Sequence, residues 1–237
     1  MDTLSDIILQ RPPTARRPLL GLTVLVVEDS RFASEAVRQM CLRSGARIRR
    51  ADSLETARRH LATYLPTVLL VDVGLPDGSG LALMETLATA TPRIEAIIGI
   101  SGDPDAEAQV RATGADGFIA KPISSLLAFQ TAILQHLPAD RQPPSPRIAT
   151  DEVINPDPIA YQDDLNHVAQ VLSDAEDGML DYVTQFLGGV ARSANDHDLD
   201  RAVHRFARAR NTGHDADSNL ATLSEMVQSR LAAGGPI

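Results

Sequence analysis

The sequence predicts an α/β fold, a doubly wound parallel sheet of the (βα)5 type, followed by a small all-helical domain. Over the first 138 residues, five short apolar runs alternate with five segments of helical periodicity. Beyond residue 158 only helical periodicity remains, and a proline-rich segment separates the two parts. Because alternating strands and helices call for a parallel sheet covered on both faces, the first part is an α/β unit.

The expected strands are LTVLVV (22–27), ARIRRA (46–51), TVLLV (67–71), IEAIIGI (94–100) and ADGFIA (115–120). The first and third are continuously apolar, as is typical of central strands buried on both faces. The second alternates and carries Arg47, Arg49 and Arg50, which is typical of an edge strand protected by charge. These features agree with the flavodoxin-like strand order 2-1-3-4-5.

The segments between the strands are amphipathic: RFASEAVRQMCL, SLETARRHLATYL, SGLALMETLA, DPDAEAQVRATG and SSLLAFQTAILQHL. The first contains Cys41, the single cysteine, which cannot form an intrachain disulfide. We expect it to be a small packing residue, and its lone occurrence suits a reducing compartment.

The predicted organisation has four parts: an N-terminal arm (1–20), the sheet domain (21–138), a proline-rich linker (139–158) and an acidic helical domain (159–237). Residues 138–158 hold six prolines and little periodicity, which indicates a semi-rigid linker. The helical domain has four apolar faces with spacings of three and four residues: Leu165, Val168, Leu172; Leu180, Val183, Leu187, Val190; Leu199, Val203, Phe206; Leu220, Leu223, Val227. Such short helices must bury these faces against one another, the sheet domain or a second subunit.

The net charge of −9 lies entirely in the C-terminal part. Residues 1–149 carry 16 Lys+Arg and 16 Asp+Glu, whereas residues 150–237 carry 6 and 15. An acidic segment repels a phosphate backbone, so we expect no DNA binding. The N-terminal stretch matches neither a secretory signal nor a membrane span, so a soluble cytoplasmic protein that does not bind membranes is expected.

Acidic residues follow the two strands that the predicted order places side by side. Glu28 and Asp29 follow the first strand, and Asp72 follows the third. Ligands of such sheets bind beyond the carboxyl ends of the strands, where the winding reverses, so the three carboxylates should converge. Because they repel one another, a cation is needed, and Mg²⁺ prefers hard oxygen ligands of this kind.

The fourth and fifth strands supply further polar groups at the same edge. Ser101 offers a hydroxyl and Lys121 a cation. With one aspartate free to act as a nucleophile toward phosphorus, the set suits a metal-bound acyl phosphate. Taken alone, the acids could instead cap turns and helices.

Four motifs, LTVLVVEDSRFA, TVLLVDVGLPDGSGLAL, AIIGISG and GADGFIAKPI, resemble the receiver domain of two-component response regulators over roughly residues 20–138. The resemblance implies that Asp72 accepts a phosphoryl group from a phosphohistidine. It also implies that Mg²⁺ is surrounded by Glu28, Asp29, Asp72 and the backbone carbonyl of Gly74. Ser101 and Lys121 would contact phosphoryl oxygens, Phe118 would be the switch aromatic, and the Lys121–Pro122 bond would be cis.

Several positions depart from the commoner family pattern. Glu28 replaces Asp, Ser101 replaces Thr, and Gly102 replaces Ala. Phe118 lacks the hydroxyl of the usual Tyr, so it would switch through packing alone, or it is simply a core residue. Gly74 is expected to leave the phosphoryl group open on one side, where Asp103 would orient or repel an attacking water.

Two further features have a plain and a functional interpretation. The arginine cluster of residues 38–59 is either a solvated face or a docking surface for the acidic segment or a phosphodonor. His204 is either an ordinary exposed helical histidine or the phosphorylated residue of a histidine phosphotransfer-like module. Ala207 and Arg208 stand where that family has Lys and a small residue.

The sequence therefore predicts a cytoplasmic response regulator that accepts phosphate on Asp72 in an Mg²⁺-dependent reaction. The expected partner is a histidine kinase or histidine phosphotransfer protein, and a homodimer is possible. The alternative is a phosphorelay intermediate with a divergent phosphotransfer module. An aspartyl-phosphate hydrolase of small molecules would need a substrate pocket and a general acid beside Asp72, so no small-molecule turnover is expected. The output of the helical domain is not predicted.

Overall fold

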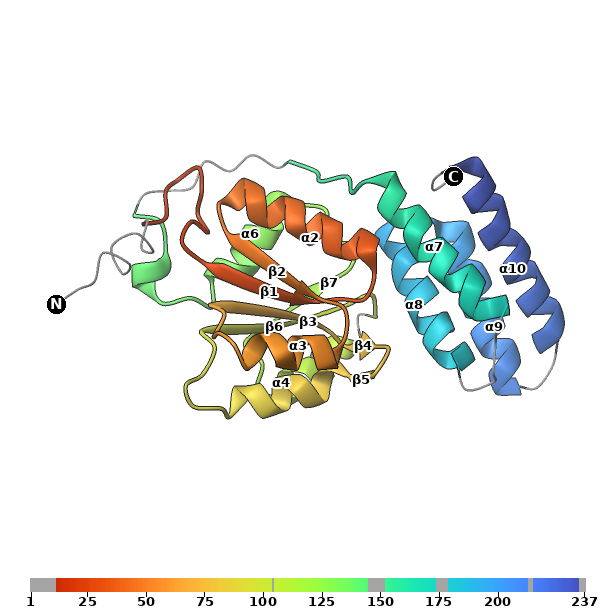
Figure 1. Ribbon diagram of the computed structural model, residues 1–237, viewed down its shortest axis with the longest axis horizontal. Coiled ribbons are helices and arrows are strands. Elements are labelled where there is room, and N and C mark those ends of the chain that lie inside the picture. Colours follow the sequence, from red (N-terminus) through yellow and green to blue (C-terminus); the bar gives the residue numbers. More distant parts are fainter. Residues whose placement is uncertain (1–11, 104, 145–151, 174–178, 213–214, 235–237) are drawn as a thin grey trace.

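The computed structural model of the protein describes residues 12–103, 105–144, 152–173, 179–212 and 215–234. A five-stranded parallel sheet has the order β2-β1-β3-β6-β7, which confirms the predicted topology (Figure 1). Its strands are β1 (Thr23–Val27), β2 (Arg47–Ala51), β3 (Val68–Asp72), β6 (Ala96–Ser101) and β7 (Gly117–Ala120). An unpredicted two-stranded hairpin, β4 (Gly74–Leu75) and β5 (Gly78–Ser79), follows β3.

Helices cover both faces of the sheet. They are α2 (Arg31–Ser44), α3 (Leu54–Leu61), α4 (Gly80–Ala88), α5 (Ala106–Ala112) and α6 (Leu126–Leu134). Figure 1 shows α2 and α6 on one face, with α3 and α4 on the other. Four of these helices begin after a serine whose side chain accepts a backbone N–H of the first turn, namely Ser30, Ser53, Ser79 and Ser125. The N-cap fixes where each helix leaves the edge of the sheet.

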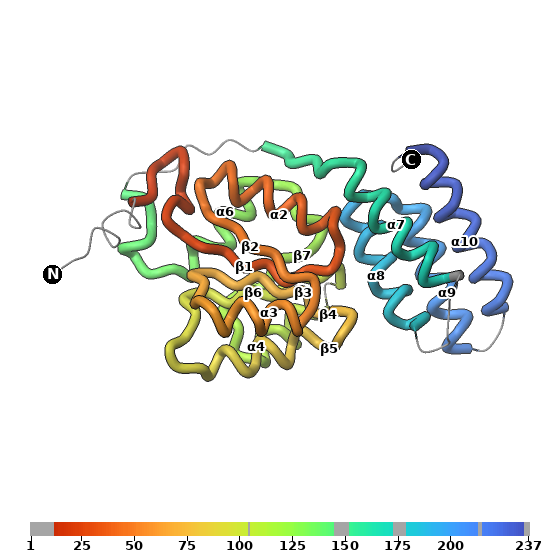
Figure 2. The backbone as a smooth tube through the Cα atoms, in the orientation of Figure 1, coloured from red at the N-terminus to blue at the C-terminus, as the bar shows by residue number. Residues whose placement is uncertain are grey.

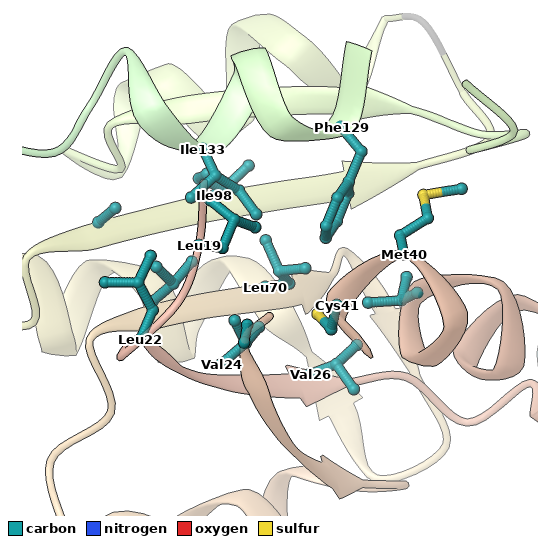
Figure 3. Packing of buried hydrophobic residues seen from close by; sticks show 14 of the residues in the cluster. Leu19, Leu22, Val24, Val26, Met40, Cys41, Leu70, Ile98, Phe129 and Ile133 are labelled. Atoms are coloured by element: carbon teal, nitrogen blue, oxygen red, sulfur yellow. The ribbon is translucent and has the colours of Figure 1, made fainter. Parts of the chain in front are cut away.

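The two central strands are buried on both faces, as predicted. Side chains such as Val24 and Leu70 pack in the core below α2 and α6, whereas Leu25 and Leu69 belong to the opposite core. Figure 3 shows the first of these cores, which also contains Cys41. Burial raises the pKa of the Cys41 thiol to about 12, so this cysteine is a packing residue.

The ends of the sheet domain extend beyond the predicted boundaries. Leu19, from the expected N-terminal arm, is fully buried in the core shown in Figure 3. Ile154, from the expected linker, is buried in the same core, and its N–H donates to Ser124 O at 2.9 Å. Glu152 forms an ion pair with Arg43 of α2. The described end of the linker is therefore attached to the sheet domain, because the apolar side chain of Ile154 is part of that core.

Four helices follow: α7 (Pro158–Ser173), α8 (Leu180–Ser193), α9 (His197–Thr212) and α10 (Ala216–Ala233). The apolar faces predicted for them meet in one shared core. Figure 2 shows this bundle beside the sheet domain, with α7 and α8 nearest to it. In the part of the chain that the structure describes, no helix is long and apolar enough to cross a membrane.

A buried ionic cluster holds the bundle together. Asp196 precedes α9, and its carboxylate accepts hydrogen bonds from Arg230 Nε (2.9 Å) and Tyr161 Oη (3.1 Å). Its other oxygen accepts from Leu199 N at 3.0 Å, which caps α9. Arg230 is on α10 and Tyr161 on α7, so one carboxylate links three helices.

Candidate functional site

Three carboxylates meet at the carboxyl ends of β1 and β3. One oxygen from each of Glu28, Asp29 and Asp72 lies within 4.8 Å of the others. β1 and β3 are neighbours in parallel register, which brings together residues 44 positions apart in the sequence. Glu28 is fully buried, whereas Asp29 and Asp72 are half-buried. The predicted convergence of the three acids is confirmed.

Lys121 supplies the positive charge inside this cluster. Its Nζ lies 2.7 Å from Asp72 Oδ2 and 2.6 Å from Glu28 Oε2, and its side chain is only 4% exposed. Burial alone would lower the pKa of Lys121, but the charges of Asp72 and Glu28 outweigh it and raise the pKa. The two acids therefore favour the charged ammonium form of Lys121. The Lys121–Pro122 bond that follows it is cis, as predicted.

One lysine does not balance three acids. Burial, together with the charges of Asp72 and Asp29, raises the pKa of Glu28 well above its usual range, against the opposing effect of Lys121. Burial, followed by repulsion from Asp72, raises the pKa of Asp29 to about 6. The raised pKa values of Glu28 and Asp29 result from burial and from the mutual repulsion of the three acids.

The carboxylates fit a divalent cation. Glu28 Oε2 is buried and lies 2.6 Å from Lys121 Nζ, a cation that it shares with Asp72. Three carboxylates around a single ammonium offer the hard oxygen ligands that Mg²⁺ prefers. Charge and ligand chemistry therefore both favour a magnesium site formed by Glu28, Asp29 and Asp72.

The acids open into a small cavity of about 30 Å³, room for one or two waters. Gly74 and Ser101, both predicted site residues, line it together with Lys121. Ser101 Oγ accepts from Asp103 N at 3.1 Å. The carboxylate of Asp103 is exposed, does not line the cavity and accepts from Asp105 N at the start of α5. In the structure, the Asp103 carboxylate is therefore a local hydrogen-bond acceptor for the backbone before α5.

Two predicted residues lie away from this cavity. Phe118 is half-buried on β7 and packs against the core below α3 and α4. His204 is exposed on α9, which packs against α8 and α10, and its Nε2 lies 3.7 Å from Asp200 Oδ1. Neither side chain lines the cavity beside Asp72.

The wall opposite the sheet comes from α8, which the sequence did not connect with the site. Gln185, Phe186, Gly189 and Arg192 all line the cavity. Tyr182 Oη donates to Asp29 Oδ2 at 3.0 Å, and burial, with the charge of Asp29, raises the pKa of this tyrosine. The expectation that Gly74 leaves the site open is wrong, because the Gln185 side chain occupies the space beside Gly74.

A second contact from the helical domain holds the start of α2. Asp164 of α7 accepts from Arg31 N at 2.8 Å, from Phe32 N at 3.0 Å and from Ser30 Oγ at 2.7 Å. The side chain of a residue 133 positions away in the chain thereby caps the helix that follows Asp29. Burial raises the pKa of Asp164, although these hydrogen bonds oppose the shift.

The fold and the site together define a class of protein domain. It is a doubly wound α/β domain with a cluster of acids, suited to a cation, at the carboxyl ends of β1 and β3, where the winding of the sheet reverses. Residues 24–130 match the response regulator receiver domain. This part of the chain is a receiver domain of two-component signalling, and a helical C-terminal region follows it.

Curated relatives resemble about half of the chain. The virulence transcriptional regulatory protein PhoP of Salmonella typhimurium (strain LT2) is 28% identical over 118 residues, which are 48% of this chain and 52% of PhoP. The transcriptional regulatory protein PhoP of Escherichia coli O6:H1 is 26% identical over 117 residues, with the same coverage of 48% and 52%. The chain thus spans about half the length of the curated relatives it matches.

Two solved structures are similar to slightly less than half of the chain. A putative response regulator from Chloroflexus aurantiacus is 29% identical, with a TM-score of 0.41, over 43% of this chain and 85% of that chain. A signal receiver domain of a histidine kinase from Syntrophus aciditrophicus is 25% identical, with a TM-score of 0.44, over 49% and 89%.

Proposed function

We propose that the protein is a cytoplasmic response regulator in which Asp72 accepts a phosphoryl group from a phosphohistidine of a histidine kinase or phosphotransfer protein. The observation that carries the proposal is the contact of Lys121 with Asp72 and Glu28 within a cluster of excess negative charge. A structural ion pair would be balanced. An acidic site with one fixed ammonium instead suits a reaction that brings in a cation and an anionic phosphoryl group.

The reaction transfers the phosphoryl group between two nucleophiles. A carboxylate oxygen of Asp72 forms the new O–P bond while the N–P bond of the phosphohistidine breaks, and the electron pair of that bond returns to the imidazole nitrogen. The donor ring carries a proton on its other nitrogen, so it leaves as neutral imidazole and the atoms and charges balance. Lys121 stands beside Asp72 and neutralises charge on the transferred group.

Glu28, Asp29, Asp72 and the backbone carbonyl of Gly74 are the residues that would hold Mg²⁺. When bound, the ion supplies neutralisation of phosphoryl charge. The chain itself keeps the acids in place: β1 and β3 position them, and Ser30 N donates to Glu28 Oε1 (3.2 Å) and Asp29 Oδ1 (3.0 Å).

Phosphorylation would be transmitted through Ser101 and Lys121, which move to meet the phosphoryl oxygens. Phe118, half-buried between the sheet and its flanking helices, would repack in response. The helical domain would be the element whose interactions change, through partner binding or dimerisation. Its acidic composition argues against a DNA-binding output.

Labelling with acetyl phosphate and Mg²⁺ tests the proposal. We expect wild type to gain one acyl phosphate, labile to hydroxylamine, and Asp72→Asn to gain none. Asp105→Asn, which removes an exposed carboxylate near α5, is the matched control and should label like wild type. Equal labelling of Asp72→Asn and wild type would exclude Asp72 as the acceptor.

A second candidate function is phosphotransfer through His204. The observation in its favour is an exposed histidine, 60% accessible, on one helix of a four-helix bundle. In this case a phosphohistidine donor would leave acid-labile phosphate on the full-length protein, and His204→Gln would abolish it. Phosphate found only on Asp72 would dismiss this alternative.

A further inference from the structure

One face of α8 lies against the receiver site. Tyr182, Gln185, Gly189 and Arg192 follow one another at spacings of three, four and three residues, so they form a single stripe along the helix. Tyr182 reaches Asp29, and the other three line the cavity beside Asp72. The stripe is polar or small, in contrast to the apolar face that α8 turns toward its own bundle.

Glycines on the sheet side make room for two of these side chains. A Cβ on Gly74 would collide with the amide of Gln185. A Cβ on Gly102 would stand 2.8 Å from Arg192 Nη2 and closer still to Nε. Glycine at residue 102 therefore leaves free the space that the guanidinium occupies.

In the guanidinium of Arg192, Nη1 donates a hydrogen bond, whereas Nε has no acceptor among the described residues. Its Nη1 donates to Asp200 Oδ1 at 2.9 Å, which anchors the group to α9. Its Nε is buried and finds no hydrogen-bond partner among the described residues. A buried N–H donor without an acceptor is uncommon, and here it belongs to a residue that lines the cavity with Asp72, Ser101 and Lys121.

We propose that Arg192 is a phosphoryl-binding residue of the receiver site, supplied by the helical domain, so that phosphorylation of Asp72 fastens α8 over the site. This inference rests on the proposed role of Asp72 as phosphoacceptor. The phosphoryl group brings added negative charge and three acceptor oxygens. Arginine is well suited to meet them with short, charge-assisted hydrogen bonds.

The size of the cavity adds a consequence. A space of about 30 Å³ holds one or two waters, less than the imidazole of a phosphodonor or the phosphoryl group itself requires. On the proposed assignment, α8 moves away during transfer and afterwards rests against the phosphoryl group, farther from the sheet than in this structure. Phosphorylation then strengthens the contact between the two parts of the chain instead of releasing it.

Beryllofluoride with Mg²⁺, a stable mimic of the phosphoryl group, tests this on the full-length protein. A ¹⁹F NMR titration measures its affinity. We expect Arg192→Gln to weaken binding about tenfold or more, the effect of losing a hydrogen bond to a charged group. The matched control is Arg201→Gln, which removes an exposed arginine paired with Asp198 and should leave affinity within about twofold.

Gly102→Ala gives an independent arm, because its methyl group displaces the guanidinium. It should weaken beryllofluoride binding as Arg192→Gln does, and the double variant should show no further loss. If the double variant lost as much beryllofluoride affinity as the two single variants together, Gly102→Ala would not act through Arg192. That result would contradict the assignment of Arg192 as a phosphoryl-binding residue.

Hydrogen exchange of residues 180–193 reports the position of α8. In wild type, beryllofluoride should slow exchange there, and in Arg192→Gln it should not. Faster exchange in wild type, or equal affinity in wild type and Arg192→Gln, would overturn the proposal. If wild type binds no beryllofluoride and is not labelled by acetyl phosphate, the proposed phosphoacceptor function fails as well, so the two failures are separable.

Discussion

The protein contains two buried ionic clusters of opposite character. In the receiver domain, three carboxylates lie together with one lysine, whose Nζ contacts Asp72 and Glu28. In the helical domain, the single carboxylate of Asp196 accepts hydrogen bonds at both oxygens, from Arg230, Tyr161 and Leu199. The two clusters use the same kinds of groups, but only the second is balanced.

The pKa values follow this difference. Burial acts on both clusters and raises the pKa of Glu28 and Asp29, where repulsion between acids adds to it. For Asp196 burial acts in the same direction, but the hydrogen bonds from Arg230 and Leu199 outweigh it, and the pKa is lowered. A cluster that holds a fold together satisfies its charge internally, whereas a cluster that receives ligands leaves charge to be neutralised by them.

The largest effect is expected from breaking the balanced cluster. Asp196→Ala leaves Arg230, whose side chain is 9% exposed, buried without its partner. Removing one member of a buried pair costs about 3–5 kcal/mol, because the remaining charge loses its compensation. Urea denaturation followed by circular dichroism measures the loss.

The control for this prediction is Asp198→Ala, two residues away, whose ion pair with Arg201 is exposed. It should change the free energy of unfolding by less than about 1 kcal/mol. Similar losses for both variants would mean that burial does not distinguish the Asp196 cluster.

The unbalanced cluster should respond in the opposite way. Asp29 carries a raised pKa, so its ionised form destabilises the fold at pH 7, and Asp29→Asn should raise the free energy of unfolding without metal by roughly 1 kcal/mol. In wild type, Mg²⁺ at a hundredfold excess over its Kd should add about 2.7 kcal/mol. The variant should lose most of that increment.

Thermal unfolding with EDTA and with Mg²⁺ measures both effects. Ca²⁺-free, Mg²⁺-free wild type is the reference, and Asp105→Asn controls for the loss of one negative charge nearby. An equal Mg²⁺ increment in wild type and Asp29→Asn would remove Asp29 from the metal site.

The ionisation of Asp196 should change the free energy of unfolding by less than the substitution Asp196→Ala does. Its pKa is lowered in the native protein, so its contribution is fully present above the ordinary aspartate pKa of about 3.9 and is lost as pH falls through the native value. The difference in stability between wild type and Asp196→Asn should therefore stay constant from neutral pH to about pH 5 and shrink as the pH falls from there to below 3. Urea titrations across this range measure it. A constant difference would show that Arg230 and Tyr161, the groups facing Asp196, do not favour its ionised form.

Most of the receiver site could be predicted from the sequence because its residues follow strands. A strand buried on both faces, such as β3, has a short apolar pattern, and its carboxyl end lies at a known edge of the sheet. Asp72 and Lys121 were placed in this way, and their contact of 2.7 Å follows from the strand order.

The wall from α8 could not be predicted in the same way. Arg192 and Gln185 lie on a polar stripe, and a polar stripe on a helix is usually solvated. The pair Gly188–Gly189 is no such signal, because a Cβ on Gly189 would meet nothing within 4 Å and one on Gly188 would meet only Arg192 and Val203 of the helical domain. The position of Arg192 and Gln185 depends on how the two domains dock, which periodicity does not encode.

A more local effect is expected at the contact between the two regions, at the start of α2. Asp164→Ala removes the hydrogen bonds to Ser30 Oγ, Arg31 N and Phe32 N, and should weaken the first turn of α2 by about 0.5–2 kcal/mol, the range for an N-cap. Asp163→Ala removes only a half-exposed ion pair with Arg31 and should cost less than about 1 kcal/mol. Hydrogen exchange of a peptide covering residues 30–37 measures both, with faster exchange expected for Asp164→Ala.

The result also concerns the acids, because the N–H of Ser30 donates to Glu28 and Asp29. Faster exchange in Asp164→Ala would show that the helical domain stabilises the backbone of the receiver site. Equal exchange in the two variants would mean that α7 lies against α2 without supporting it.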